Sequence, residues 1–175
     1  MELLLFAEAD PSAVNLSGRT PLHFGRTEEV VDILLECGSH PGFVDEEGRT
    51  PLFALALAGR TSAVRALLAA ESGQAVLDLP DKRGDTPTHA ATSANHVELL
   101  ILLLSAGADL IAVNEDGFSA MQVAERNEHA ECAAAIKEKG AQHLPSGWAV
   151  FCESISRFIR NPSRNSHHSI TSRSS

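Results

Sequence analysis

Several residue types are scarce or absent in this chain of 175 residues, and each absence narrows the class of protein. Tyrosine is missing, tryptophan occurs once, and aromatic residues make up 5% of the sequence. Leucine and alanine supply much of the apolar content instead, and both are strong helix formers. An all-β sandwich draws on aromatic and β-branched residues, so the composition argues against that class.

Cysteines and long apolar runs are scarce as well. Cys37, Cys132 and Cys152 form an odd number without close pairs, which argues against a disulfide scaffold and fits a reducing compartment. The longest apolar stretches, at 52–58 and 99–104, are too short to cross a membrane. The start of the chain lacks the basic and apolar segments of a signal peptide. We therefore expect a cytoplasmic location, with the nucleus as an alternative.

Positive charge is the third scarcity. The chain has 14 Lys and Arg against 23 Asp and Glu, for a net charge of −9. Residues 1–141 hold 22 of the acidic and 10 of the basic side chains, whereas residues 142–175 hold one and four. An acidic body lacks the basic footprint that nucleic acids require, so we expect no nucleic-acid partner. The uneven charge predicts a folded acidic body and a basic tail.

What the sequence does contain is a segment repeated about every 33 residues. Gly-x-Thr-Pro begins at Gly18, Gly48 and Gly84, and a weaker copy begins at Gly117. Asp-x-x-Gly in front of this motif is typical of a type I turn. Threonine is a good N-cap and proline fits the first helical position, so a short helix is expected next. A leucine-rich segment then predicts a second helix in each unit.

These features together resemble the ankyrin repeat family over residues 3–141. The resemblance implies an all-α solenoid of stacked helix-turn-helix units joined by short β-hairpin loops. The motifs that carry it are Thr20-Pro21-Leu22-His23, Thr50-Pro51-Leu52-Phe53 and Thr86-Pro87-Thr88-His89, with the Leu-Leu-x-x-Gly segments. The expected repeat domain covers residues 1–141, with a partial unit at 3–15 and units at about 16–44, 45–79, 80–112 and 113–141.

Some units depart from this pattern. The first Gly-x-Thr-Pro unit is three residues short between His23 and Val31, so its inner helix is expected to lose most of a turn. The next unit carries three extra residues around 71–79. The last copy of the motif, at 119–122, is typical of a polar terminal cap. The start in the middle of a repeat predicts a fragment, a diverged isoform or an incomplete gene model.

Two further segments are expected after the repeats. Residues 142–160 predict an amphipathic C-terminal helix, with an apolar stripe that contains Trp148 and Phe158. Residues 161–175 are rich in Ser and Arg and predict a disordered tail. Three roles stay open for the helix: packing on the last repeat, binding a partner, or weak contact with a membrane through 147–160.

No catalytic signature is present, and neither a cofactor nor a metal is expected. For His23 and His89, and for His96 and His129, the family resemblance implies hydrogen bonds to nearby turns. The alternative is an enzyme or metal-binding protein that uses His129 and Cys132, two ligands short of a closed site. We interpret Cys37 and Cys132 as core cysteines rather than as nucleophiles.

The hairpin tips and the exposed inner-helix positions are the candidate binding surface, because the tips have no evident role in the fold. The alternative for any one tip residue is that it is only a solvated part of the rim and does not bind a partner. Phe118 is an aromatic residue beside a turn, the type that anchors interfaces. The predicted partner-binding residues are Glu46, Glu47, Arg49, Leu57, Lys82, Arg83, Asp85, Ser93, Glu115, Asp116, Phe118 and Arg126.

The resulting prediction is a non-catalytic adaptor or scaffold that binds a protein partner of unknown identity. We expect it to be a monomer or a component of a larger complex. A peripheral membrane adaptor that uses the helix at 147–160 is the alternative from a different class.

Overall fold

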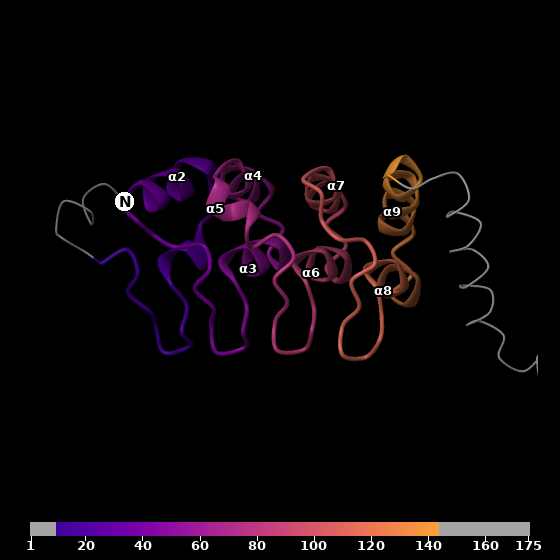
Figure 1. Ribbon diagram of the computed structural model, residues 1–175, viewed down its shortest axis with the longest axis horizontal. Helices are drawn as coiled ribbons and strands as arrows, with labels where there is room; N and C mark the ends of the chain where they lie inside the picture. The colour runs from indigo at the N-terminus through magenta and orange to yellow at the C-terminus, as the bar shows by residue number, and fades with distance from the viewer. Residues whose placement is uncertain (1–9, 144–175) are drawn as a thin grey trace, which may run out of the picture. The chain divides into compact units, whose positions relative to one another are not determined.

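The computed structural model describes residues 10–143, which fall almost entirely in a compact unit of residues 1–139. A second unit, residues 140–175, is described only as far as His143. Figure 1 shows inner helices beside the hairpins and a layer of outer helices above them. The inner and outer helices pair in the order η1 (Pro21–Phe24) and α2 (Glu28–Glu36), α3 (Pro51–Leu57) and α4 (Thr61–Ala69), α6 (Pro87–Ser93) and α7 (Val97–Ser105), α8 (Ala120–Arg126) and α9 (Ala130–His143).

The inner helices begin as the sequence predicts, with a hydroxyl residue as N-cap. The Thr50 hydroxyl accepts a hydrogen bond from the Phe53 amide at 3.2 Å, and Pro51 takes the first helical position. In the last unit, the Ser119 amide donates to the Gln122 side chain at 2.9 Å, which completes a capping box. Local chemistry therefore sets the same starting point in units whose later residues differ.

A continuous apolar core runs between the inner and outer layers. Leu22, Leu52 and Leu55 contribute from the inner helices, and Leu67 and Leu99 from the outer helices, all with no more than 1% of their surface exposed. Each helix pair buries its apolar faces against the neighbouring pairs, as expected for a repeat protein. The prediction of an all-α solenoid is confirmed for the described residues, in which the hairpins contribute only one isolated bridge, between Val113 and Ser119.

The shortened first inner helix is also confirmed. It is a four-residue 3₁₀ helix, η1, followed directly by Gly25. A Cβ atom at Gly25 would lie 2.9 Å from the Val31 side chain, so the short connection leaves no room for a larger residue. The shortened segment thus still brings Val31 into the core.

The extra residues of the next unit form α5 (Glu71–Gln74) and the turns that follow it. Gly73 is buried against the Leu67 carbonyl, and the Gln74 amide group donates to the Leu68 carbonyl at 2.9 Å. Val76 and Leu77 are buried in the core. The insertion therefore packs on the end of α4.

Of the two cysteines interpreted as core residues, the structure buries one and exposes the other. Cys132 is fully buried, which confirms its interpretation as a core residue. The same interpretation of Cys37 is wrong, because Cys37 is exposed. It is the C-cap of α2, and the chain turns away at Gly38, which has φ +89°. Cys152 lies outside the described residues.

The predicted C-terminal helix at 142–160 and the tail at 161–175 lie outside the described residues, except that 142 and 143 end α9. None of the helices described between residues 10 and 143 is long and apolar enough to span a membrane.

Candidate functional site

The hairpins are held side by side by backbone hydrogen bonds between their tips. Each of three tips donates one amide to a carbonyl of the preceding tip at 3.0 Å. These bonds run from Glu46 to Ser17, from Lys82 to Glu47 and from Glu115 to Arg83. Equivalent residues of successive hairpins therefore lie in rows, below the inner helices in Figure 1.

Side chains add a second link between neighbouring hairpins. Arg19 Nε lies 2.9 Å from Asp45 Oδ2, and Arg49 Nε lies 3.8 Å from Asp81 Oδ2 at the equivalent position. Between the last two hairpins the direction is reversed, because the donor lies on the later hairpin. There the Asn114 amide group donates to Asp85 at 2.8 Å. The expectation that tip side chains have no role in the fold is therefore wrong for Arg49 and Asp85.

Asp45 shows how an acidic side chain stabilises the hairpins by accepting hydrogen bonds. Burial disfavours its charged form, but the Arg49 and Glu47 amides and the Arg19 guanidinium hold the pKa of Asp45 below its usual value. The two amides donate to Asp45 Oδ1 at 2.9 and 3.0 Å. Asp81 accepts from the Arg83 and Asp85 amides in the same way.

His23 and His89 tie an inner helix to the next hairpin. The Thr20 amide donates to His23 Nδ1 at 3.1 Å, which places the proton on Nε2, and Nε2 then donates to the Arg49 carbonyl at 3.0 Å. His89 repeats this arrangement between Thr86 and the Phe118 carbonyl. Burial lowers the pKa of His23, so the neutral ring is the form that fits. These bonds confirm the structural role that the family resemblance implied.

His129 and Cys132 are engaged in separate hydrogen bonds. His129 Nδ1 lies 2.9 Å from the Thr92 carbonyl, and the Cys132 thiol donates to the Asn95 side chain at 3.3 Å. Burial raises the pKa of Cys132, which favours the thiol over the nucleophilic thiolate. Within residues 10–143, no three potential ligands gather to hold a metal ion. His96 bonds to the Leu57 carbonyl at 3.2 Å.

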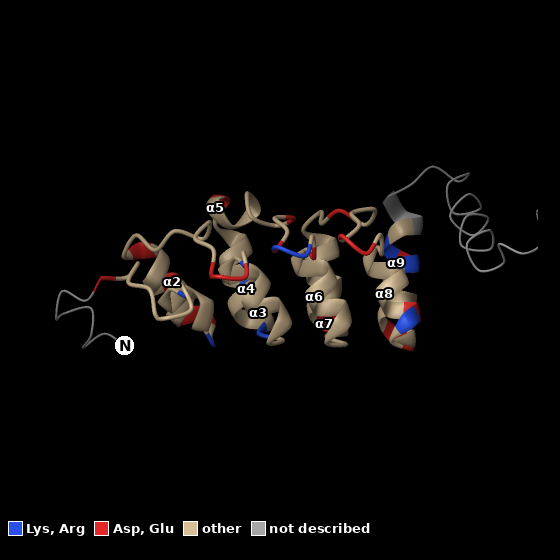
Figure 2. Ribbon diagram, turned by 90° about the horizontal axis from the view of Figure 1, so that it is seen from below, with Lys and Arg blue, Asp and Glu red and all other residues tan. Residues whose placement is uncertain are grey.

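Between the hairpins and the inner helices α3, α6 and α8 lies a hollow of about 400 Å³. Eight of the twelve predicted partner-binding residues line it: Arg49, Leu57, Arg83, Asp85, Ser93, Asp116, Phe118 and Arg126. The other four, Glu46, Glu47, Lys82 and Glu115, are exposed at the tips and lie outside it. In Figure 2 the basic hairpin before α6 lies between two acidic hairpins.

The hollow combines an apolar floor with a charged rim. Phe53 and Ala90 are buried in the floor, whereas Leu57 keeps 41% of its surface exposed. The Arg126 guanidinium lies over the Phe118 ring, with 5.0 Å from Cζ to the ring centroid. Polar and charged side chains make up most of the lining, and apolar side chains make up the rest.

The predicted partner-binding residues leave out seven residues that line this hollow: Phe53, Asp81, His89, Ala90, Asn114, Val123 and Asn127. One signal was available for Phe53, which stands in the position that histidine holds in two other units. A phenyl ring cannot make the bond that His23 and His89 make to the next hairpin. Its ring instead lies 5.7 Å from the Arg49 guanidinium carbon.

Comparison with known proteins agrees with this architecture. The model of the family described as ankyrin repeats (3 copies) matches residues 1–76, 23–114 and 68–146. The chain is 29% identical over 132 residues to the nuclear factor NF-kappa-B p105 subunit of Gallus gallus, which covers 73% of this chain and 13% of that relative. It is 32% identical over 126 residues to SH3 and multiple ankyrin repeat domains protein 2 of Homo sapiens, covering 70% and 7%.

A third relative is the transient receptor potential cation channel subfamily A member 1 homolog of Caenorhabditis elegans, 31% identical over 132 residues, or 74% of this chain and 11% of the relative. The chain thus spans a small fraction of the length of these relatives. Ankyrin repeats are in general protein–protein interaction modules and not catalysts. With the family model matched along most of its length, this chain belongs to the ankyrin repeat family.

Proposed function

We propose that the chain is a non-catalytic adaptor that binds a partner protein in the hollow between its hairpins and inner helices. The observation that carries this proposal is the gathering of eight predicted binding positions around one hollow. Side chains from three successive repeats contribute to it, so no single repeat forms the site alone. The proposed repeat domain covers residues 1–141, and the four exposed tip residues extend the contact beyond the hollow.

The chemistry of the titratable side chains supports binding over catalysis. The histidines at the hairpins are occupied in hydrogen bonds, and burial keeps the Cys132 thiol protonated. A nucleophile requires the opposite, a lowered pKa and a base within reach. The membrane alternative depends on residues 147–160, which lie outside the described residues. Co-sedimentation with anionic liposomes, with and without residues 142–175, tests that alternative separately.

A matched pair of exposed apolar residues tests the proposed binding face. Leu57 borders the hollow and Ile101 lies on the outer helix α7, and each has 41% of its surface exposed. A partner isolated with the 175-residue chain should bind Leu57→Ser more weakly and Ile101→Ser unchanged. Phe118→Ala should cost about 1–2 kcal/mol of binding free energy if Phe118 anchors the partner. Equal binding by both serine variants would place the interface elsewhere.

A further inference from the structure

The acidic side chains of the hollow are already engaged in the fold. Asp81 Oδ1 accepts two backbone amides, at 2.8 and 3.0 Å, and its Oδ2 faces Arg49 at 3.8 Å. Asp85 accepts from the Asn114 side chain at 2.8 Å. Asp116 is the exception, because it is exposed at a tip. Two of the three carboxylates around the hollow therefore already accept hydrogen bonds from other groups of the chain.

Two of the three arginines around the hollow are in the opposite state. Arg83 and Arg126 are exposed at the rim, and no carboxylate between residues 10 and 143 lies within 4.0 Å of either guanidinium. Arg126 lies over the Phe118 ring. An aromatic ring does not occupy a guanidinium as a carboxylate does, so the N–H donors of Arg126 remain able to bind a carboxylate with two hydrogen bonds.

Building on the proposed function, we infer that the hollow recognises an acidic segment of the partner: a carboxylate side chain held by Arg126 and Arg83, beside an apolar side chain on Leu57. The charge complementarity is local and opposes the net charge of the chain. An acidic repeat domain alone favours a basic partner, whereas the unpaired donors at this hollow favour aspartate or glutamate. Leu57 would contact the apolar half of the recognised segment, and Arg83 and Arg126 the acidic half.

A peptide selection with the full chain tests this partner chemistry. Short random peptides displayed on phage are selected on the 175-residue protein, and the enriched sequences are synthesised for affinity measurements. The expected peptides carry Asp or Glu next to Leu, Ile or Phe, and their binding weakens as salt is added. Arg126→Glu should weaken binding by about tenfold or more, and Arg126→Gln by less, because it removes the charge without repulsion.

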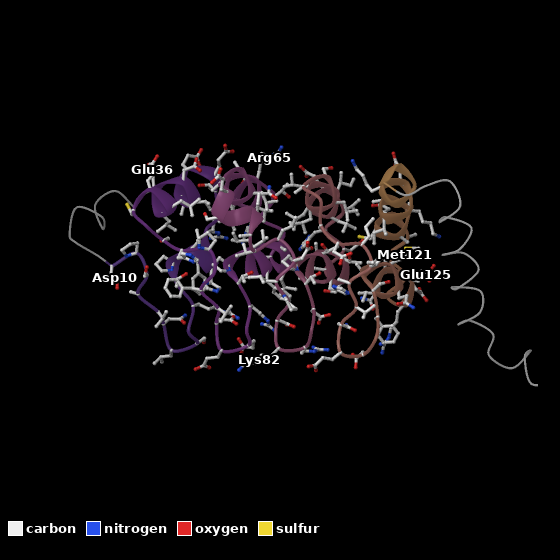
Figure 3. The ribbon with its side chains drawn as sticks, viewed as in Figure 1. Asp10, Glu36, Arg65, Lys82, Met121 and Glu125 are labelled. Carbon is white, nitrogen blue, oxygen red and sulfur yellow. The ribbon has the colours of Figure 1, made fainter. Side chains whose placement is uncertain are left out.

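Arg65 provides the matched control. It is exposed on the outer helix α4, on the opposite side of the layer from Lys82 (Figure 3). Arg65→Glu makes the same change in net charge as Arg126→Glu and should leave binding within about twofold. A peptide in which the acidic residue is replaced by lysine should bind Arg126→Glu better than the parent protein. That reversal would show that residue 126 contacts the acidic position of the peptide directly. General charge repulsion would not produce it.

Three results would overturn the inference. Enrichment of basic peptides, equal effects of Arg126→Glu and Arg65→Glu, or no reversal with lysine would each refute recognition of a carboxylate. If Leu57→Ser still weakens the selected peptides in those cases, the hollow remains a binding site with other chemistry. If Leu57→Ser has no effect either, the proposed function at this face fails together with the inference.

Discussion

Two buried threonines in α6 allow the same substitution to be made twice with opposite expected signs. Thr88 and Thr92 are four residues apart, on one face of the helix, and both are fully buried. The Thr92 hydroxyl donates to the Thr88 carbonyl at 2.8 Å. The Thr88 hydroxyl has no hydrogen-bond partner among the residues that the structure describes. Valine keeps the shape of threonine and replaces the hydroxyl with a methyl group.

The magnitudes follow from the state of each hydroxyl. A buried hydroxyl without a partner costs about 1–3 kcal/mol, so Thr88→Val should raise the free energy of unfolding by about 1–2 kcal/mol. Thr92→Val removes a satisfied hydrogen bond and should lower it by about 1 kcal/mol. Threonine and valine have similar helix propensities, so that contribution cancels in the comparison.

Thermal and urea unfolding, followed by far-ultraviolet circular dichroism, would measure both effects on the full chain. A change of 1 kcal/mol corresponds to a shift of about 2–4 °C in the midpoint for a protein of this size. The two variants should therefore move the midpoint in opposite directions. The reasoning is refuted if Thr88→Val is no more stable than the parent, or if Thr92→Val is as stable as the parent.

Three further predictions concern other parts of the fold. Because burial lowers the pKa of His23, the stability it contributes is present above its ordinary value of 6.5 and is lost as the pH falls toward the folded-state value. Urea midpoints at pH 7.5 and 5.5 should therefore differ more for the parent than for His23→Gln. Gly73→Ala should destabilise by about 2 kcal/mol or more, although alanine is the better helix former, because its Cβ would clash with the backbone of α4. Equal urea midpoints for parent and variant would contradict this. In a Cys152→Ser background, a thiol reagent should modify Cys37 in the native protein and Cys132 only after unfolding. Equal rates at the two thiols would contradict the assigned burial.

The repeated part of the fold was predictable because local chemistry decides it. Threonine before proline sets the start of α3, and at its end Gly59, with φ +67°, follows the C-cap Ala58. The three missing residues after His23 likewise predicted the short η1. These inferences needed only neighbouring residues, and the short helix expected after the Thr-Pro motif is observed as α3, Pro51–Leu57.

The side-chain contacts of the site were less predictable, since they depend on how separate hairpins align. The Arg49–Asp81 contact joins residues of different units, and the contact of the Arg126 guanidinium with the Phe118 ring joins a hairpin to the helix that follows it. The exposure of Cys37 depends on where α2 ends, which the helical pattern leaves uncertain by a residue or two. The sequence predicted eight of the positions around the hollow but did not indicate which charged side chains are already paired.

Net charge counts acidic side chains that are already engaged in the fold. An acidic residue inside a hairpin is also a structural acceptor: Asp45 and Asp81 each receive two backbone amides, and both are buried. Such carboxylates contribute to the charge of −9 yet have little capacity left for a partner. An arginine at the rim has no comparable use within its own turn, because the turn needs acceptors and a guanidinium offers only donors. The scarcer charge is therefore the more available one at the hollow.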